Sequence, residues 1–496
     1  MINVTNKTYV LRGGGQGEEL AVAQTAALFG LAAANEAGDW RNKAVVIYHQ
    51  FLQDGQGTAS ICELFYHTPD GPRYAARRDY DADCSDLRQR RWLLRLNLYW
   101  LLQAVTGGKP NAWGILAGVK PAKLVHRLLD QGCSASSVVQ SLQQTFALQP
   151  EKARLLTGIA LRQRPFLLNS GPERNVSIYI GIPFCPSRCL YCSFPAYAIP
   201  AADSVQAFLR ALFTDMAAAA ATVARYGLAV QSVYIGGGTP TSLQERDLEA
   251  LLALTAELFA GPATEFTVEA GRPDSLNDVK IELLRAYKVS RVSVNPQTMQ
   301  QKTLKLIGRM HSVQDIIDTF GKIRACNIAA VNMDVIAGLP GETAADMADS
   351  MRQIAALKPD NLTVHTLALK RGSRLSEAAG RYKTPDAAVT AAMLHIAGHT
   401  ARELGMRPYY LYRQKRMAGN LENVGYALPG TECVYNIQVL AERQTILGIG
   451  PAAATKAVRP GGLTAYYHPK DLATYISTLP DRLQKRDALL AAALVT

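Results

Sequence analysis

Short apolar runs alternate with amphipathic runs through the middle of the chain. Six runs rich in β-branched and aromatic residues are bounded by glycine or polar residues, which predicts strands. They cover residues 176–182, 232–236, 265–269, 290–295, 331–336 and 361–366. Between them, apolar residues recur at the spacing of one helix face. This alternation predicts parallel βα units, with functional side chains at the carboxyl ends of the strands.

Two of the intervening helices carry recognisable start signals. The run Ser242-Leu-Gln-Glu245 has the pattern of a capping box, and Ser312 opens a helix in which Ile316 and Phe320 share one face. Both helices are expected to be crossover connections between neighbouring strands.

The regions on either side of the six units differ in character. Residues 1–171 combine strand patterns at 44–48 and 60–66 with helix patterns at 92–105 and 121–129, which predicts an N-terminal α+β domain of unknown role. Aromatic and leucine residues at helical spacing are expected in its core. They are Trp92, Leu93, Leu96, Trp100 and Leu101.

The partial barrel is expected over residues 172–385. Residues 386–496 begin with a helix that runs through Leu404 and continue with an aromatic and basic run at 408–415. We expect this tail to be a C-terminal α/β extension that covers the substrate at the barrel mouth.

Composition narrows the class of protein. Lys and Arg number 53 against 41 Asp and Glu in 496 residues, and because the charges are dispersed, no nucleic acid partner is indicated. The longest apolar stretches, 216–221 and 489–495, are far shorter than a membrane span. The first residues lack a secretory pattern, which favours a cytoplasmic, reducing setting. No coiled coil or repeat is present, so a monomer is expected.

Three of the 8 cysteines, Cys185, Cys189 and Cys192, follow the first predicted strand. Chance gives this spacing with a frequency of roughly a few in a thousand. Zinc sites usually draw a second ligand pair from elsewhere, disulfides need an oxidising compartment, and burial as small apolar groups is the remaining alternative. An iron–sulfur cube held by three cysteines leaves one iron open to a non-protein ligand. The pattern therefore favours a catalytic cluster.

With these cysteines, the chain resembles the radical S-adenosylmethionine (SAM) superfamily over about residues 177–456. Five motifs are similar to those of the oxygen-independent coproporphyrinogen III oxidase family. They are Tyr179-x-x-Ile-Pro-Phe-Cys185, Gly236-Gly-Gly-Thr-Pro-Thr241, Gln297, Arg309-Met-His311 and Asn332-Met-Asp-Val-Ile-Ala-Gly-Leu-Pro-Gly-Glu342. The runs 406–415 and 420–427 resemble its HemZ-type branch most.

The resemblance implies an α/β fold, an open three-quarter (β/α)6 radical SAM barrel. It also implies a [4Fe-4S] cluster on the three cysteines and SAM chelated at the open iron, whose cleavage yields a 5′-deoxyadenosyl radical. The implied SAM contacts are Tyr179, Tyr191, Gly237, Gly238, Thr239, Glu269, Gln297, Arg309 and Asp334, with Ala368 for a second SAM molecule. From the residues alone, the glycines equally fit a tight turn, and Glu269 and Asp334 fit strand-end salt bridges.

The substrate that the resemblance implies is coproporphyrinogen III, a tetrapyrrole whose two adjacent propionates would be oxidatively decarboxylated to vinyl groups. The product is protoporphyrinogen IX in haem biosynthesis, and an unidentified electron donor is required. Arginine forks bind carboxylates well, although a solvated surface is the alternative. The cations expected near the barrel mouth are Arg371, Arg374, Arg407, Arg413, Lys415 and Arg416.

Two positions depart from the decarboxylating members of the family. Phe194 stands where they carry a fourth cysteine, and Gly181 replaces their histidine. The chain is therefore identified as a radical SAM oxidoreductase, with a haem chaperone or a haem-modifying radical SAM protein as the alternatives. No side chain is assigned as catalytic.

Overall fold

The computed structural model describes residues 8–13, 17–34, 44–54, 57–68, 70–81, 86–107, 111–168, 175–262, 264–378, 380–414, 417–459 and 462–494. The chain forms two compact units. One comprises residues 1–117 and 128–157, and the other residues 118–127 and 158–496. The unit boundaries fall next to or within α3 (Ala122–Asp130) and α5 (Pro150–Leu168).

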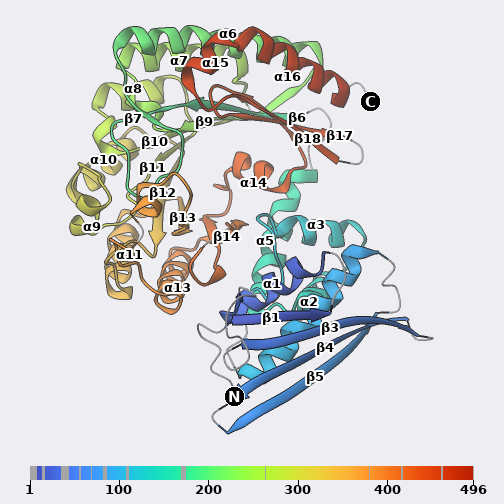
Figure 1. The fold of residues 1–496 in the computed structure, drawn as a ribbon. Coiled ribbons are helices and arrows are strands. Elements are labelled where there is room, and N and C mark those ends of the chain that lie inside the picture. The colour runs from blue at the N-terminus through green and yellow to red at the C-terminus, as the bar shows by residue number, and fades with distance from the viewer. Residues whose placement is uncertain are drawn as a thin grey trace. The chain divides into compact units, whose positions relative to one another are not determined.

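The first unit is a sheet in the order β2-β1-β3-β4-β5, on which α1 and α2 pack (Figure 1). Its strands β3, β4 and β5 are antiparallel neighbours, and β1 is parallel to β2 and β3. The strands are β1 (Thr8–Gly13), β2 (Ala32–Ala33), β3 (Ala44–Asp54), β4 (Gly57–Thr68) and β5 (Gly71–Asp81), and the helices are α1 (Glu19–Ala26), α2 (Leu87–Thr106) and α4 (Ala135–Phe146). The strand and helix patterns predicted at 44–48, 60–66 and 92–105 lie within β3, β4 and α2.

The prediction of a core stripe on α2 is correct for only part of the set. Leu93 and Leu101 are buried, but Trp92, Leu96 and Trp100 are only half-buried. These three line an open groove of about 480 Å³. The reason is that the sheet covers one side of α2, so the side that carries the tryptophans keeps partial access to solvent.

The second unit is built on an 11-stranded sheet in the order β14-β15-β13-β12-β11-β10-β9-β6-β16-β17-β18. Its six central strands run parallel and in sequence order, and each overlaps one predicted strand. They are β6 (Asn175–Ile182), β9 (Ala229–Gly237), β10 (Glu265–Gly271), β11 (Arg291–Val294), β12 (Ala330–Ala337) and β13 (Asn361–Thr366). The expected (β/α)6 partial barrel is confirmed.

The connections between these strands are helical. They are α6 (Ala202–Arg225), α7 (Glu245–Phe259), α8 (Asp278–Ala286), α9 (Gln301–Leu306), α10 (Val313–Ala325) and α11 (Ala344–Leu357). Ser312 caps α10 in a capping box with Asp315, as predicted. The capping box predicted at Ser242 is wrong, because α7 begins after Gln244, and the Ser242 hydroxyl donates to the Phe184 carbonyl instead.

The C-terminal segment adds strands to both edges of the barrel sheet. β14 (Arg407–Tyr412) and β15 (Asn423–Ala427) extend the β13 edge, while β16 (Thr445–Ile449), β17 (Ala454–Arg459) and β18 (Gly462–Tyr467) extend the β6 edge. The helices of this segment are α13 (Ala387–Glu403), α14 (Val434–Ala441), α15 (Leu472–Ser477) and α16 (Leu479–Leu494). The predicted helix through Leu404 is α13, capped by Asp386.

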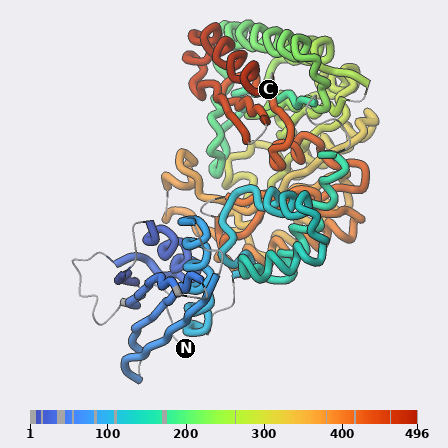
Figure 2. Tube along the Cα trace, turned by 90° about the vertical axis from the view of Figure 1, so that its right-hand side faces the viewer, coloured from blue at the N-terminus to red at the C-terminus, as the bar shows by residue number. Residues whose placement is uncertain are grey.

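By length and composition alone, α6 is long and apolar enough to cross a membrane. In the structure it is the crossover between β6 and β9, and its Phe208, Leu212 and Met216 are fully buried. α16 lies alongside it in both views (Figures 1 and 2). These contacts are those of a core helix in the barrel.

Candidate functional site

The three cysteines lie on the loop that follows β6, at the carboxyl end of the barrel strands. The short strands β7 (Phe184–Cys185) and β8 (Tyr197–Ala198) pair and close the base of this loop. Cys185, Cys189 and Cys192 are free thiols that line one cavity of about 140 Å³. Burial raises the pKa values of the Cys185 and Cys192 thiols.

The thiol arrangement fits an iron–sulfur cube better than a single ion. In the described part of the chain, no three His, Cys, Asp or Glu side chains converge as ligands of one metal ion. In a cube each thiolate binds its own iron corner, so the sulfurs are spread more widely. The described residues that line this cavity include no fourth cysteine and no histidine. Three thiolates around one space are what an open-cornered cube requires.

The glycine loop after β9 lies directly against the cysteine loop. The Gly238 amide donates to the Ile182 carbonyl (2.7 Å), and the Thr239 amide donates to the Phe184 carbonyl (2.7 Å). A Cβ at Gly238 would lie 2.4 Å from the Phe184 oxygen, so a side chain has no space there. The Thr239 hydroxyl is 3.5 Å from the Cys185 sulfur. The turn is thus both tight and part of the cavity wall.

Glu269 and Asp334 face the barrel interior, and within the described residues neither pairs with lysine or arginine. The Tyr234 hydroxyl donates to Glu269 Oε1 (2.5 Å), and the Gly237 amide contacts Oε2 (3.3 Å). Burial raises the pKa of Glu269 to about 7. Burial opposes ionisation of Asp334, but hydrogen bonds from His365 and Asn332 outweigh it and lower the pKa of this carboxyl. The strand-end salt bridges considered from the sequence are therefore not what the fold contains.

The raised pKa of Glu269 predicts a pH-dependent stability of the protein without cofactors. Its carboxyl ionises near 4.5 in the unfolded chain and near 7 in the fold, so stability present below pH 4.5 is lost as the pH rises through 7. The expected loss is about 3 kcal/mol. Urea unfolding at a series of pH values should show this decline in the native sequence and its absence in Glu269→Gln. Parallel pH profiles for the two proteins would contradict the assignment.

Gln297 and Arg309 are both buried, although their residue types alone indicate solvated side chains. Gln297 has a left-handed backbone (φ 68°), and its amide donates to the Asp334 carbonyl (2.8 Å). Arg309 donates to the Asn295 carbonyl (2.5 Å) and lies 3.4 Å from the Tyr191 hydroxyl. The fold therefore holds both side chains at the cavity wall, next to the loop of the cysteines.

Two further cavities continue the space beside the cysteines. One of about 330 Å³ lies within the barrel and includes Glu269 and Asp334, and one of about 210 Å³ includes Tyr191, Gln297 and Ala368. Neighbouring cavities share lining residues, so they form one connected region. Every predicted SAM contact except Tyr179 lines it. Tyr179 instead stacks with the rings of Tyr234 and Tyr435.

The cations predicted near the barrel mouth are scattered. Arg407 begins β14 and is paired with Ala427, which faces the amino end of β13, so its placement at the mouth is wrong. The sequence pattern did not show the direction of this strand. Arg413 is buried and donates to the Asn420 carbonyl (3.2 Å). Arg371 and Arg374 are exposed after β13. Lys415 and Arg416 lie outside the described residues.

The two departures from the family pattern are accommodated by neighbouring rings. A Cβ at Gly181 would lie 3.4 Å from the ring of Tyr179, so that ring occupies the space beside the glycine. The Phe194 ring lies against Gly237 and lines the cavity of the cysteines.

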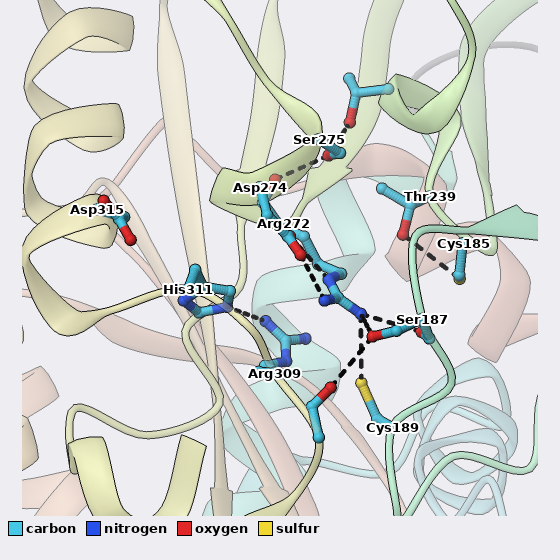
Figure 3. Close-up of polar contacts among 12 residues, drawn as sticks. Cys185, Ser187, Cys189, Thr239, Arg272, Asp274, Ser275, Arg309, His311 and Asp315 are labelled. Carbon is cyan, nitrogen blue, oxygen red and sulfur yellow. Dashed lines mark hydrogen bonds and ion pairs between the residues drawn. The ribbon is translucent and has the colours of Figure 1, made fainter. Parts of the chain in front are cut away.

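Sequence reasoning missed one buried side chain at this site, Arg272. It follows β10 and points at the cysteine loop from the neighbouring strand end (Figure 3). Its guanidinium donates to the carbonyl (3.0 Å) and hydroxyl (2.9 Å) of Ser187 and lies 3.9 Å from the Cys189 sulfur. An arginine between glycine and proline has the pattern of a surface turn, so no sequence signal marks it.

Comparisons with known proteins agree with this geometry. The model of the radical SAM superfamily matches residues 179–354. The oxygen-independent coproporphyrinogen-III oxidase-like protein HemZ of Bacillus subtilis (strain 168) is 41% identical over 383 residues, 76% of each chain. The haem chaperone HemW of the same organism is 34% identical over 194 residues, 38% of this chain and 50% of HemW.

Among solved structures, coproporphyrinogen III oxidase (HemN) from Escherichia coli has a TM-score of 0.52 and 22% identity. The match covers 65% of this chain and 73% of that chain, and it supports the fold. The extent and identity of the HemZ match decide the family. The chain therefore belongs to the radical SAM superfamily and, within it, to the family of the oxygen-independent coproporphyrinogen-III oxidase-like protein HemZ.

Proposed function

We propose that the protein is a radical SAM oxidoreductase that removes two propionate carboxyl groups of coproporphyrinogen III as carbon dioxide and yields protoporphyrinogen IX. Membership of the superfamily implies a [4Fe-4S] cluster and SAM. Together they would supply a carbon radical strong enough to abstract hydrogen from an unactivated carbon. The observation that carries the proposal is the connected set of cavities that leads from the three thiols into the barrel.

The chain's own residues divide the work in this proposal. Cys185, Cys189 and Cys192 hold the cluster, and the close-packed Gly237-Gly238 turn lets SAM approach the backbone. Glu269 and Asp334 accept hydrogen bonds from the hydroxyl or amino groups of SAM, since carboxylates lacking a cationic partner keep free acceptor capacity. Tyr191, Gln297 and Arg309 close the wall between the two SAM-facing cavities, and Ala368 contacts a second SAM molecule.

The charges of the cavities favour one direction of substrate entry. Glu269 and Asp334 face the 330 Å³ cavity, and its one arginine among the described residues, Arg291, pairs with Glu265 (3.5 Å). Lys370 lines the 210 Å³ cavity, and Arg188 lines the cavity of the cysteines. Carboxylates are therefore favoured on the side of Lys370 and Arg188. We place the reacting propionate there and the rest of the tetrapyrrole at the mouth, beneath the C-terminal segment.

Haem binding without decarboxylation is the second candidate function. Two observations favour it, namely Phe194 in place of a fourth cysteine and the 34% identity to HemW. His365 is the one histidine among the described residues that line the three cavities, and its Nδ1 is 3.1 Å from the Tyr412 hydroxyl. Haem ligation at this site would use His365.

The test is an anaerobic reaction of cluster-loaded protein with SAM, a strong reductant and either coproporphyrinogen III or haem. The proposal predicts tetrapyrrole products that have lost one and then two carbon dioxide molecules, with 5′-deoxyadenosine formed alongside. Unchanged coproporphyrinogen III, together with a haem absorption band that is lost in His365→Ala, would reject decarboxylation in favour of haem binding. The assay also fits a cytoplasmic monomer with an external electron donor, which we propose on the sequence evidence.

A further inference from the structure

Arg272 is the buried arginine that lies between β10 and the cysteine loop. Its side chain is 3% exposed. The Nη1 group faces the cysteine loop, where it contacts Ser187 and lies 3.9 Å from the Cys189 sulfur (Figure 3). The other edge of the guanidinium faces Asp274, to which Nε (2.9 Å) and Nη2 (2.6 Å) both donate. One planar group therefore joins a carboxylate to a cysteine sulfur.

The backbone holds this arrangement in place. The Arg272 amide donates to the Ala270 carbonyl (2.6 Å), and the Arg272 carbonyl accepts from the amide (3.1 Å) and hydroxyl (2.7 Å) of Ser275. Ser275 in turn bonds to Thr241, which follows the glycine loop (2.6 Å). Because the turn after β10 is fixed at both ends, Arg272 has little freedom to leave the cysteine loop.

The other ligands have weaker partners of this kind. Cys185 has the Thr239 hydroxyl at 3.5 Å, a neutral group. Arg309 also lies near the loop, but its hydrogen bonds go to the Asn295 carbonyl and the Tyr191 hydroxyl. Among the described residues, Arg272 is thus the cation with a printed contact to a cysteine sulfur and with a carboxylate partner of its own.

Electrostatics gives this contact a direction. Reduction adds an electron to a cluster that already carries three thiolates, so a nearby cation and an N–H donor to sulfur stabilise the reduced form. A nearby carboxylate has the opposite effect. Arg272 and Asp274 therefore act on the cluster with opposite signs, and burial keeps water from screening Arg272.

We propose that Arg272 is a positioning residue that sets the reduction potential of the cluster, and that Asp274 limits its effect. The inference rests on the cluster of the proposed function, and it is independent of the tetrapyrrole substrate. It explains why a buried ion pair is placed at the end of β10, where a purely structural role would be served by apolar packing.

The test is a potentiometric titration of the reconstituted cluster, followed by its paramagnetic resonance signal, with no tetrapyrrole present. In Arg272→Gln, the ratio of reduced to oxidised cluster at a fixed potential should fall about tenfold, which is about 59 mV for one electron. In Asp274→Asn the ratio should rise. Arg272→Lys keeps the charge without the fork and should fall between the native protein and Arg272→Gln. The exposed Arg285→Gln, which removes a charge from α8, should leave the potential unchanged.

Iron and sulfide content separates the two levels of the account. If the native protein assembles no cluster, the proposed function fails. If the cluster assembles, an unchanged potential in Arg272→Gln would overturn this inference, as would shifts of the same sign in Arg272→Gln and Asp274→Asn. If Arg272→Gln does not load, Arg272→Lys and Asp274→Asn decide, because a structural role predicts no rise in the potential of Asp274→Asn.

Discussion

Replacing Cys192 with alanine is expected to abolish reductive cleavage of SAM. The three thiols line one cavity, and the described lining residues include no fourth cysteine or histidine that could replace a lost ligand. A cube with two thiolates has two unprotected corners and is not retained. Anaerobic reconstitution should therefore give little bound iron and no 5′-deoxyadenosine, whereas the native protein gives both.

Cys326→Ala is the matched control for this change. Cys326 follows α10, is half-buried like Cys192, and is a free thiol. Its loss removes the same atoms at a distance in sequence from the cluster loop, so iron content and SAM cleavage should stay at the native level. Full cluster loading in Cys192→Ala would show that this thiol is not a ligand.

Removing the Arg486 side chain is expected to cost the barrel unit much of its stability. Arg486 on α16 pairs with Asp215 on α6 (2.5 Å), and neither side chain is exposed. The Tyr475 hydroxyl (2.8 Å) and the Gly450 amide (3.0 Å) also donate to this carboxylate. In Arg486→Met, Asp215 would be a buried charge without its cation, which costs about 3–5 kcal/mol. Unfolding free energies are commonly only about 5–15 kcal/mol.

Denaturant unfolding of the barrel unit measures this loss as a lower midpoint. The double variant Asp215→Leu, Arg486→Met removes both charges and should recover most of the stability, since an apolar pair of similar volume replaces a buried ion pair without a large cost. Arg285→Met breaks an exposed ion pair with Glu282 and should leave the midpoint unchanged. A small effect of Arg486→Met would show that the C-terminal helix is not anchored to α6 by this pair.

The parallel core of the fold was predictable because its signals are local. Strands such as β12 and β13 are buried on both faces, so their sequences are nearly continuous apolar runs with clear ends. The cysteine spacing is equally local, since Cys185, Cys189 and Cys192 lie on one loop. For these features, neighbours in sequence decide the structure.

The sheet edges were not predictable in the same way. β16 pairs with β6, which precedes it by more than half the length of the barrel unit, and nothing in the β16 sequence names its partner. The direction of β14 likewise follows from its pairing with β15, and this is why Arg407 lies at the opposite end from the cysteines. Pairing between distant segments depends on the assembled sheet.

The site shows the same division. The glycine turn and Glu269 follow strands directly, so their place at the carboxyl ends could be expected. Arg272 acts through Cys189, a residue far from it in sequence, and Tyr179 turns toward the rings of Tyr234 and Tyr435. Such contacts arise only when separate strands meet, which the residue pattern of one segment does not report.

The most direct test of the central claim uses coproporphyrinogen III deuterated at the propionate β-carbons. The cluster-loaded protein is incubated anaerobically with this substrate, SAM and a strong reductant, and the masses of 5′-deoxyadenosine and of the tetrapyrroles are measured together. The account predicts that each carbon dioxide lost is matched by one deuterium transferred to 5′-deoxyadenosine. Formation of 5′-deoxyadenosine without deuterium, and without loss of carbon dioxide, would contradict it.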